Sequence, residues 1–243
     1  MRNLWTKELG GKWRIVVSVL ILMLWGVTLA AEPVWAADAN SLIQDSINVI
    51  KAMGEQSDVE SMADVIKDAH AVAFIPAMVK AGLIIGGEYG EGFILRKEGN
   101  KWFGPSFYNM GGGSLGLQIG VQKTAFVLIV NNEKGVEAFL RSRAKLGADV
   151  AVAAGPVGRR GDAATDGRLE ASIYSYSMTK GLFAGVSLDG AALSISVKRN
   201  KEYWKKDMAA ADALKTPATD KRILPLIQEI QRISQKAKGS GHV

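Results

Sequence analysis

The sequence GGGSLGLQIG, residues 111–120, matches two functional signatures, and the residues that follow the glycines decide between possible folds. Gly111, Gly113 and Gly116 fit the G-x-G-x-x-G pattern of dinucleotide-binding loops. Gly112, Ser114 and Gly116 fit the G-x-S-x-G turn that carries the nucleophile of serine hydrolases. Both signatures join a strand to a helix in an α/β fold, so either one requires a helix directly after the glycines.

The residues after the triple glycine indicate a strand instead of a helix. From Leu115 to Val121 every second residue is apolar, and a period of two is typical of a half-buried strand. The other face carries only Gly116, Gln118 and Gly120, so a ligand or another backbone can approach it closely, or the sheet can bend there. We therefore predict no nucleotide ligand and five structural glycines, which are Gly111, Gly112, Gly113, Gly116 and Gly120.

The sequence offers little chemistry for catalysis. A nucleophile elbow at Ser114 needs a histidine further along the chain, but His70 precedes it and His242 is the penultimate residue. The chain has no cysteine, which excludes disulfides, thiolate metal sites and cysteine nucleophiles. We therefore predict a protein that is not an enzyme and holds no metal or cofactor, with a serine hydrolase based on Ser114 as the less favoured alternative.

Amphipathic helices are predicted before the glycine-rich region. Apolar residues recur with helical spacing over residues 41–53, where Ser41 is suited to cap the helix. The pattern resumes over residues 57–70, where Ser57 and Glu60 have the spacing of a capping box. The polar face of these helices is acidic, which argues against their insertion into a membrane surface.

Strand patterns separated by turns follow these helices. Residues 71–76 form an apolar strand that its final proline should end, and residues 124–132 form another, followed by a helix over 133–143. Residues 181–199 have the pattern of a hairpin with Asp189-Gly190 at its turn. The sequence thus predicts an α+β fold in which a strongly bent, mainly antiparallel, barrel-like sheet is flanked by N-terminal and C-terminal helices.

The first 36 residues have the pattern of a secretory signal peptide. Four basic residues within Met1–Arg14 precede the uncharged run Ile15–Ala30, and Val34 and Ala36 fit the −3 and −1 positions of a cleavage site. An inner-membrane anchor formed by residues 15–37 is the alternative. We expect a periplasmic or secreted protein of net charge +4, because four of the 30 basic and two of the 24 acidic residues lie in the segment removed.

Several blocks of the sequence resemble the SYLF domain family. They include FIPAMVKAGLIIGGEYGEGFILR at residues 74–96, GPSFYNM directly before the triple glycine, and SIYSYSMTKGLFAGVSLDGAALS at residues 172–194. The resemblance covers residues 64–204. It leaves a helical segment at residues 37–63 and a tail at residues 205–243, which is helical in two pieces punctuated by prolines.

This resemblance implies a non-enzymatic lipid-binding domain. Eukaryotic members of the family bind lipids, including phosphoinositides, and bacterial members are typically exported. The resemblance therefore implies a lipid-binding protein of the bacterial cell envelope, whose partner is an anionic lipid or membrane surface and not a nucleic acid. A scaffold that binds another envelope protein is the alternative. The family supplies no catalytic residue.

Basic residues in loops are the candidate contacts for an anionic headgroup. Arg159 and Arg160 are adjacent in the polar loop GPVGRRGD, and arginine side chains can form bidentate hydrogen bonds with a phosphate. Arg168 follows in the same loop, and Lys180 lies in the turn TKG; a solvated turn is the alternative role for both segments. A second basic group within residues 141–145 follows a predicted helix, where bases also complement the helix dipole.

Overall fold

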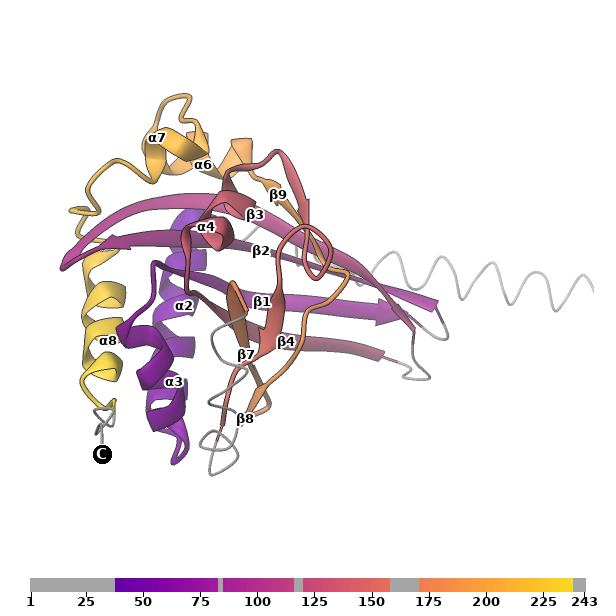
Figure 1. Cartoon of the computed structure of the whole chain (residues 1–243). Coiled ribbons are helices and arrows are strands. Elements are labelled where there is room, and N and C mark those ends of the chain that lie inside the picture. The colour runs from indigo at the N-terminus through magenta and orange to yellow at the C-terminus, as the bar shows by residue number, and fades with distance from the viewer. Residues whose placement is uncertain (1–37, 83–84, 116–119, 158–170, 238–243) are drawn as a thin grey trace, which may run out of the picture. The chain divides into compact units, whose positions relative to one another are not determined.

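The computed structural model of the chain describes residues 38–82, 85–115, 120–157 and 171–237 (Figure 1). The helices are α2 (Ala39–Gly54), α3 (Val59–Lys67), α4 (Glu133–Leu140), α6 (Val197–Trp204), α7 (Ala210–Ala213) and α8 (Leu224–Ser234). The strands are β1 (Ala71–Gly82), β2 (Ile85–Glu98), β3 (Lys101–Leu115), β4 (Gly120–Val130), β5 (Arg143–Lys145), β6 (Val152–Ala154), β7 (Ile173–Thr179), β8 (Leu182–Gly185) and β9 (Ala192–Ile195). None of these helices is long and apolar enough to cross a membrane.

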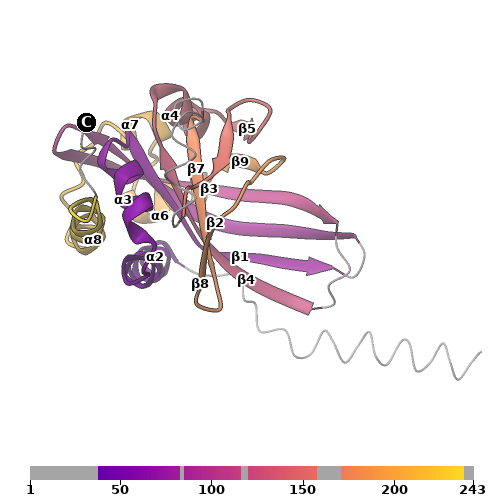
Figure 2. The ribbon, with the colours of Figure 1, turned by 60° about the horizontal axis from the view of Figure 1, so that its bottom comes forward.

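All nine strands belong to one sheet. Its order is β5-β9-β3-β2-β1-β4-β7-β6, and β8 pairs with β7 off this path. Every strand pair is antiparallel except β6–β7. The four long strands β1 to β4 form the middle, and their glycine-rich ends project away from the helices (Figure 1, Figure 2). The predicted α+β fold with a mainly antiparallel sheet is therefore confirmed.

The connection between the two edge strands shows how strongly the sheet is bent. β5 and β6 lie at opposite ends of the strand order, yet only residues 146–151 connect them. A connection of this length spans at most about 20 Å when fully extended. A flat sheet of eight neighbouring strands would place its edges roughly 34 Å apart at a spacing of about 4.8 Å, so the sheet must curl.

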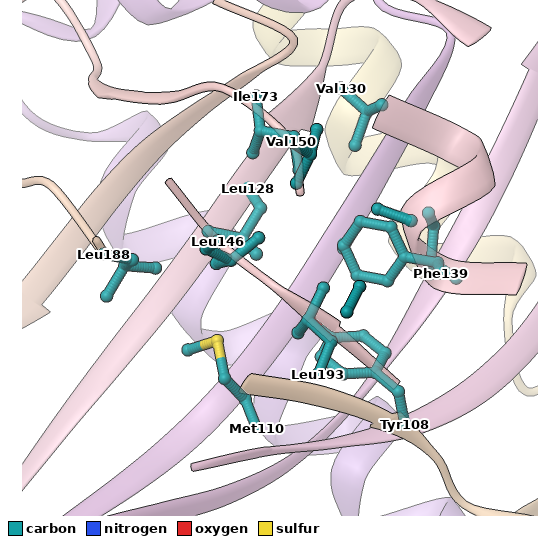
Figure 3. Packing of buried hydrophobic residues seen from close by; sticks show 14 of the residues in the cluster. Tyr108, Met110, Leu128, Val130, Phe139, Leu146, Val150, Ile173, Leu188 and Leu193 are labelled. Carbon is teal, nitrogen blue, oxygen red and sulfur yellow. The ribbon is translucent and has the colours of Figure 1, made fainter. Parts of the chain in front are cut away.

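Both faces of the sheet are buried near its centre. On one face, Phe74, Phe93 and Phe107 are register partners in three neighbouring strands, and their rings lie 5.5 Å apart. This row continues at 5.5 Å to Tyr203 of α6. The other face carries the apolar cluster shown in Figure 3, where Tyr108 of β3 packs edge-on against Phe139 of α4 at 4.9 Å. Consecutive apolar side chains in a strand point to opposite faces of the sheet, so these strands supply two core layers.

The prediction that β1 ends at its proline is wrong. β1 continues to Gly82, and the register with β2 shifts between Phe74 and Ala77, on either side of Pro76. Proline has no N–H to donate to a neighbouring strand, and a bulge lets the chain pass it without losing the rest of the ladder. The strand is consequently about twice as long as the apolar pattern indicates.

Both predicted helix caps are also wrong. The N-cap of α2 is Asp38, whose carboxylate accepts hydrogen bonds from the backbone N–H and the hydroxyl of Ser41, both at 2.7 Å. The N-cap of α3 is Asp58, one residue after the predicted Ser57, and the Asp58 side chain makes no cap hydrogen bond. In both cases an aspartate one to three residues from the predicted serine starts the helix, and either residue type satisfies the sequence rule.

Two predicted strand arrangements are wrong because local patterns do not identify partners. Leu115 ends β3 and Gly120 begins β4, and these strands are separated in the sheet by β2 and β1, so Leu115–Val121 is not one strand. The segments around Asp189-Gly190 do not form a hairpin, since β8 pairs with β7 while β9 pairs with β3 and β5. Gly190 instead donates its N–H to the carbonyl oxygen of Leu146 at 2.9 Å, in the segment after β5.

Candidate functional site

The triple glycine is part of strand β3. Gly111, Gly112 and Gly113 pair with Tyr89, Glu88 and Gly87 of β2. The strand continues to Leu115, and the next described element is β4, so no helix N-terminus stands beside the glycines to hold a phosphate. A Cβ added at Gly113 or at its partner Gly87 would meet no atom within 4 Å. Gly116 lies outside the described residues.

Ser114 has no histidine that could activate it among the described residues. Ser114 pairs with Gly86 at the projecting end of β3. His70 lies at the opposite end, where its carbonyl oxygen accepts from the N–H of Lys97, the partner of Trp102. The twelve residues from Trp102 to Ser114 correspond to roughly 40 Å of strand. His242 is outside the described residues.

The surroundings of His70 form an open pocket of about 440 Å³ that is lined by charged side chains of both signs. Arg96 contacts Glu98 at 3.2 Å and Glu133 at 3.1 Å, and the Nδ1 atom of His70 lies 3.8 Å from Glu133. The ammonium group of Lys97 donates to the carbonyl oxygen of Lys67 at 2.7 Å. Among the described residues, no group of three or more His, Asp or Glu side chains is placed to hold a metal ion. Arg96 and two of the three carboxylates that line the pocket are therefore paired with one another, and Lys67 and Asp68 also line it.

Lys180 lies at the tip of the β7–β8 hairpin, as the turn TKG predicts. β7 and β8 pair from Tyr176 with Gly185 to Thr179 with Leu182, which leaves Lys180 and Gly181 as a two-residue turn. Both turn residues have positive φ, 50° and 82°, which matches the right-handed twist of a hairpin. In both ribbon views the tip projects past β4 (Figure 1, Figure 2).

The base of this hairpin adjoins the start of the arginine loop. Gly155 donates its N–H to the carbonyl oxygen of Ser175 at 2.9 Å. Its Cα faces the ring of Tyr176, since an added Cβ would lie 2.2 Å from that ring. An added Cβ on Gly185, the last residue of β8, would lie 1.8 Å from the carbonyl oxygen of Gly155, so the two glycines are in direct contact. The three predicted lipid contacts that follow lie outside the described residues; they are Arg159, Arg160 and Arg168.

Leu182 is the surface residue that the sequence reasoning missed. Its relative exposure is 76%, the highest among the large apolar side chains described as exposed. It directly follows the turn that carries Lys180, so a basic and an apolar side chain stand together at the tip. Sequence patterns did not mark Leu182, because its exposure depends on which strand ends beside it in the sheet.

The second basic group is divided between a helix end and an edge strand, since Arg141 is the C-cap of α4 and Arg143 and Lys145 lie on β5. α4 ends at Leu140, and Arg143 and Lys145 lie on β5 on either side of buried Ala144. Both side chains are exposed. Charged residues on an edge strand hinder pairing with other chains, which is a sufficient structural role for them.

Comparisons with known proteins identify the family. A family model described as Ysc84, Las17-binding protein actin regulator, matches residues 111–233. The chain is 31% identical over 184 residues to the human SH3 domain-containing YSC84-like protein 1, a match that covers 72% of this chain and 54% of that protein. It is 36% identical over 151 residues to LAS seventeen-binding protein 3 of Saccharomyces cerevisiae, covering 60% of this chain and 33% of that protein.

A third relative is an SH3 domain-containing protein of Schizosaccharomyces pombe, which is 40% identical over 141 residues, covering 56% of this chain and 33% of that protein. The chain thus spans between a third and about half of the length of the curated relatives it matches. The family match begins at Gly111 and includes the hairpin, β9 and the three C-terminal helices. This chain therefore belongs to the Ysc84 family, whose domain is the SYLF domain.

Proposed function

We propose that this protein is a non-enzymatic binding protein that recognises anionic lipid surfaces in a bacterial cell envelope. Family membership supports a binding role, since the relatives carry the names of actin-regulator and Las17-binding proteins and not of enzymes. Within the described residues, Ser114 and His70 lie at opposite ends of the long strands.

The observation that carries this proposal is the pairing of basic and apolar character at the β7–β8 hairpin. Lys180 is exposed and Leu182 is two residues away. Binding to an anionic membrane increases with both accessible apolar area and positive charge, so a surface that combines them is favoured. Arg159 and Arg160 follow Gly155, which contacts the hairpin base, by four and five residues in the sequence.

Replacing the two arginines together tests the electrostatic part of this proposal. Each basic residue near an anionic surface contributes about 1 kcal/mol, so Arg159→Ala with Arg160→Ala should weaken binding by about tenfold or more at low salt. The loss should shrink at high salt, where charges are screened. Sedimentation with phosphatidylglycerol-containing vesicles at two salt concentrations measures both effects.

The chain offers a matched control for the change in net charge. Arg143→Ala with Lys145→Ala removes the same two charges from the edge strand β5. The proposal expects this variant to retain most of the affinity. Equal losses in the two double variants would assign binding to overall charge, and unchanged binding in the Arg159 and Arg160 variant would remove these residues from the site.

A protein partner is the second candidate function. The names of the yeast and human relatives refer to protein binding and SH3 domains. The projecting end of the sheet also offers open strand edges, because β9 covers β3 only from Tyr108 to Gly111 and β7 covers β4 only from Ala125 to Val130. Exposed edges can pair with a strand from another chain. Absence of vesicle binding at low salt would favour this candidate.

Export is part of the proposal. The described fold starts with Asp38 capping α2, and the backbone N–H of Ala39 donates to Glu202 at 2.9 Å. Cleavage after Ala36 would therefore leave the described elements intact. Intact-mass measurement of the exported protein should show an N-terminus at or within a few residues of Ala37, whereas a mass that still includes Met1 would support the membrane anchor.

A further inference from the structure

We propose that the tip of the β7–β8 hairpin is a membrane-inserting wedge. In this arrangement Leu182 enters the interfacial region of an anionic bilayer while Lys180 stays at the level of the headgroups. The inference rests on the proposed lipid-binding function and adds an insertion site to it. It depends on the exposure, the rigidity and the charge of the tip.

Exposure alone does not distinguish Leu182, because single exposed apolar residues are common on protein surfaces. Its position does. Leu182 is the first residue after the turn, and its partner Thr179 is the last residue before it. The tip of the hairpin projects past β4 in two views (Figure 1, Figure 2), and Leu182 in this tip is 76% exposed. A projecting apolar residue fits a deformable lipid interface better than a groove in a folded partner.

The hairpin is held firmly both beside its turn and at its base. The hydroxyl groups of Thr179 and Thr124 lie 2.9 Å apart, which fastens β7 to β4 directly beside the turn. The ring of Phe183 stacks on that of Tyr176, with centroids 5.6 Å apart and planes 2° from parallel. A tip that is already ordered loses little conformational entropy when it inserts, so more of the apolar gain appears as affinity.

The charge of the tip matches an anionic surface. No acidic residue occurs between Ile173 and Ser187, and Lys180 has no salt-bridge partner among the described residues. Lys123 is exposed and directly precedes Thr124, which contacts Thr179 beside the turn. A second positive charge therefore lies on the strand next to the tip. Lysine can keep its ammonium group in water while its alkyl chain lies along an apolar surface, which suits the headgroup region.

A fluorescent probe at the tip tests insertion directly. The chain has no cysteine, so Leu182→Cys provides a single site for an environment-sensitive fluorophore. Val197→Cys is the matched control, because Val197 is 68% exposed and lies on α6, away from the hairpin in sequence. With vesicles of phosphatidylglycerol and phosphatidylcholine, emission from position 182 should shift to the blue and be quenched by lipid-borne quenchers, while emission from position 197 should not change.

Sedimentation of the same labelled samples separates failure of the inference from failure of the proposed function. Protein that sediments with the vesicles while the probe at position 182 keeps its emission would overturn insertion and leave lipid binding intact. Equal shifts at positions 182 and 197 would also overturn it. If neither sample sediments at low salt, the proposed function and the inference both fail.

A second variant tests the energetic role of the side chain without a probe. Leu182→Ser should leave the melting temperature nearly unchanged, because Leu182 is largely exposed. It should weaken vesicle binding by roughly tenfold at both low and high salt, because apolar burial is not screened by ions. Unchanged affinity in this variant would overturn the inference.

Discussion

At the scale of single residues, the glycines of the central sheet have different roles. A Cβ on Gly92 would lie 2.0 Å from the carbonyl oxygen of Phe74, on the strand that bulges at Pro76. Gly87 lies on β2, as Gly92 does, and a Cβ on Gly87 would meet nothing within 4 Å. Gly92 is therefore required by the close approach of the β1 backbone, whereas Gly87 keeps a surface free of side chains.

This difference predicts opposite effects of the same substitution. Gly92→Ala should lower the free energy of unfolding by roughly 1–3 kcal/mol, because the backbone of β1 must move to make room. Gly87→Ala should be neutral or slightly stabilising, since alanine restricts the unfolded chain more than glycine does. Urea unfolding of the two variants measures both values. Equal free energies of unfolding for the two variants would mean that the β1 backbone can move away from the added methyl group without loss of stability.

An ion pair in the C-terminal segment predicts a pH dependence. The guanidinium group of Arg222 donates hydrogen bonds to Asp220 and lowers the pKa of its carboxyl from 3.8 to about 2. The lowered pKa means that the ionised pair stabilises the fold above about pH 4, and that this contribution is lost as the pH falls towards 2. Arg222 also lies over the ring of Tyr203 at 4.1 Å and donates to Asn40, so it joins α6 and α2 to this segment.

We expect Asp220→Asn to be less stable than the original protein at pH 7 and nearly equal to it at pH 2. Urea unfolding at pH values between 2 and 7 would follow the difference, and comparing the two proteins cancels the other carboxyl groups. A difference that stays constant across this range would show that ionisation of Asp220 does not contribute.

Residue-level sequence rules found the turn at Lys180 but not the bulge or the caps. The turn is predictable because two positive φ values in TKG depend on local backbone preferences. The bulge at Pro76 depends on strands that are distant in sequence, and Asp38 and Asp58 compete with nearby serines of similar capping ability. The exposure of Leu182 is also set by which strand ends beside it, and this requires the sheet order.

At the scale of elements, α8 completes the helix layer over the sheet. Its buried residues are Leu226, Ile227, Ile230 and Ile233. The ammonium group of Lys236, directly after the helix, donates to the carbonyl oxygen of Gly54 at the end of α2 at 2.7 Å. The C-terminal segment is thus packed on the N-terminal helices instead of extending from the domain.

Substitutions on the two sides of α8 should separate packing from helix propensity. Ile230→Ala should cost about 2–5 kcal/mol of unfolding free energy, because Ile230 is 1% exposed and its removal leaves a cavity. Leu224→Ala, at a position 39% exposed in the first turn, should cost much less. Thermal unfolding compares them, and similar losses of stability would contradict the packing role of α8.

Element types were more predictable than element partners. The apolar run at residues 124–132 identified β4, and the helical period identified α2, because each pattern reports which sides of a segment are buried. The same pattern cannot state which strand lies alongside, so β8 and β9 were predicted as partners although they belong to different parts of the sheet. Pairing depends on contacts between segments far apart in sequence.

At the scale of the whole molecule, charge and shape make different contributions. A net charge of +4 without the predicted signal is too small to give strong binding to any anionic surface, so the arrangement of charge matters more than its total. The sheet holds a basic and apolar tip on a hairpin that is fastened to β4 beside its turn and projects past that strand. The family resemblance predicted the binding class, but the projecting tip follows from the curled sheet and was not visible in sequence patterns.

Equilibrium binding of the purified protein to vesicles tests recognition of anionic lipid surfaces most directly. The fraction of phosphatidylglycerol in phosphatidylcholine vesicles is varied at about 0.01 M and about 0.1 M salt, where the Debye length falls from roughly 30 Å to roughly 10 Å. We predict that binding rises with the anionic fraction and weakens, without vanishing, at the higher salt concentration, because the apolar contact at Leu182 persists. Absence of binding at every composition at low salt, or binding that does not depend on the anionic fraction, would contradict the proposed function.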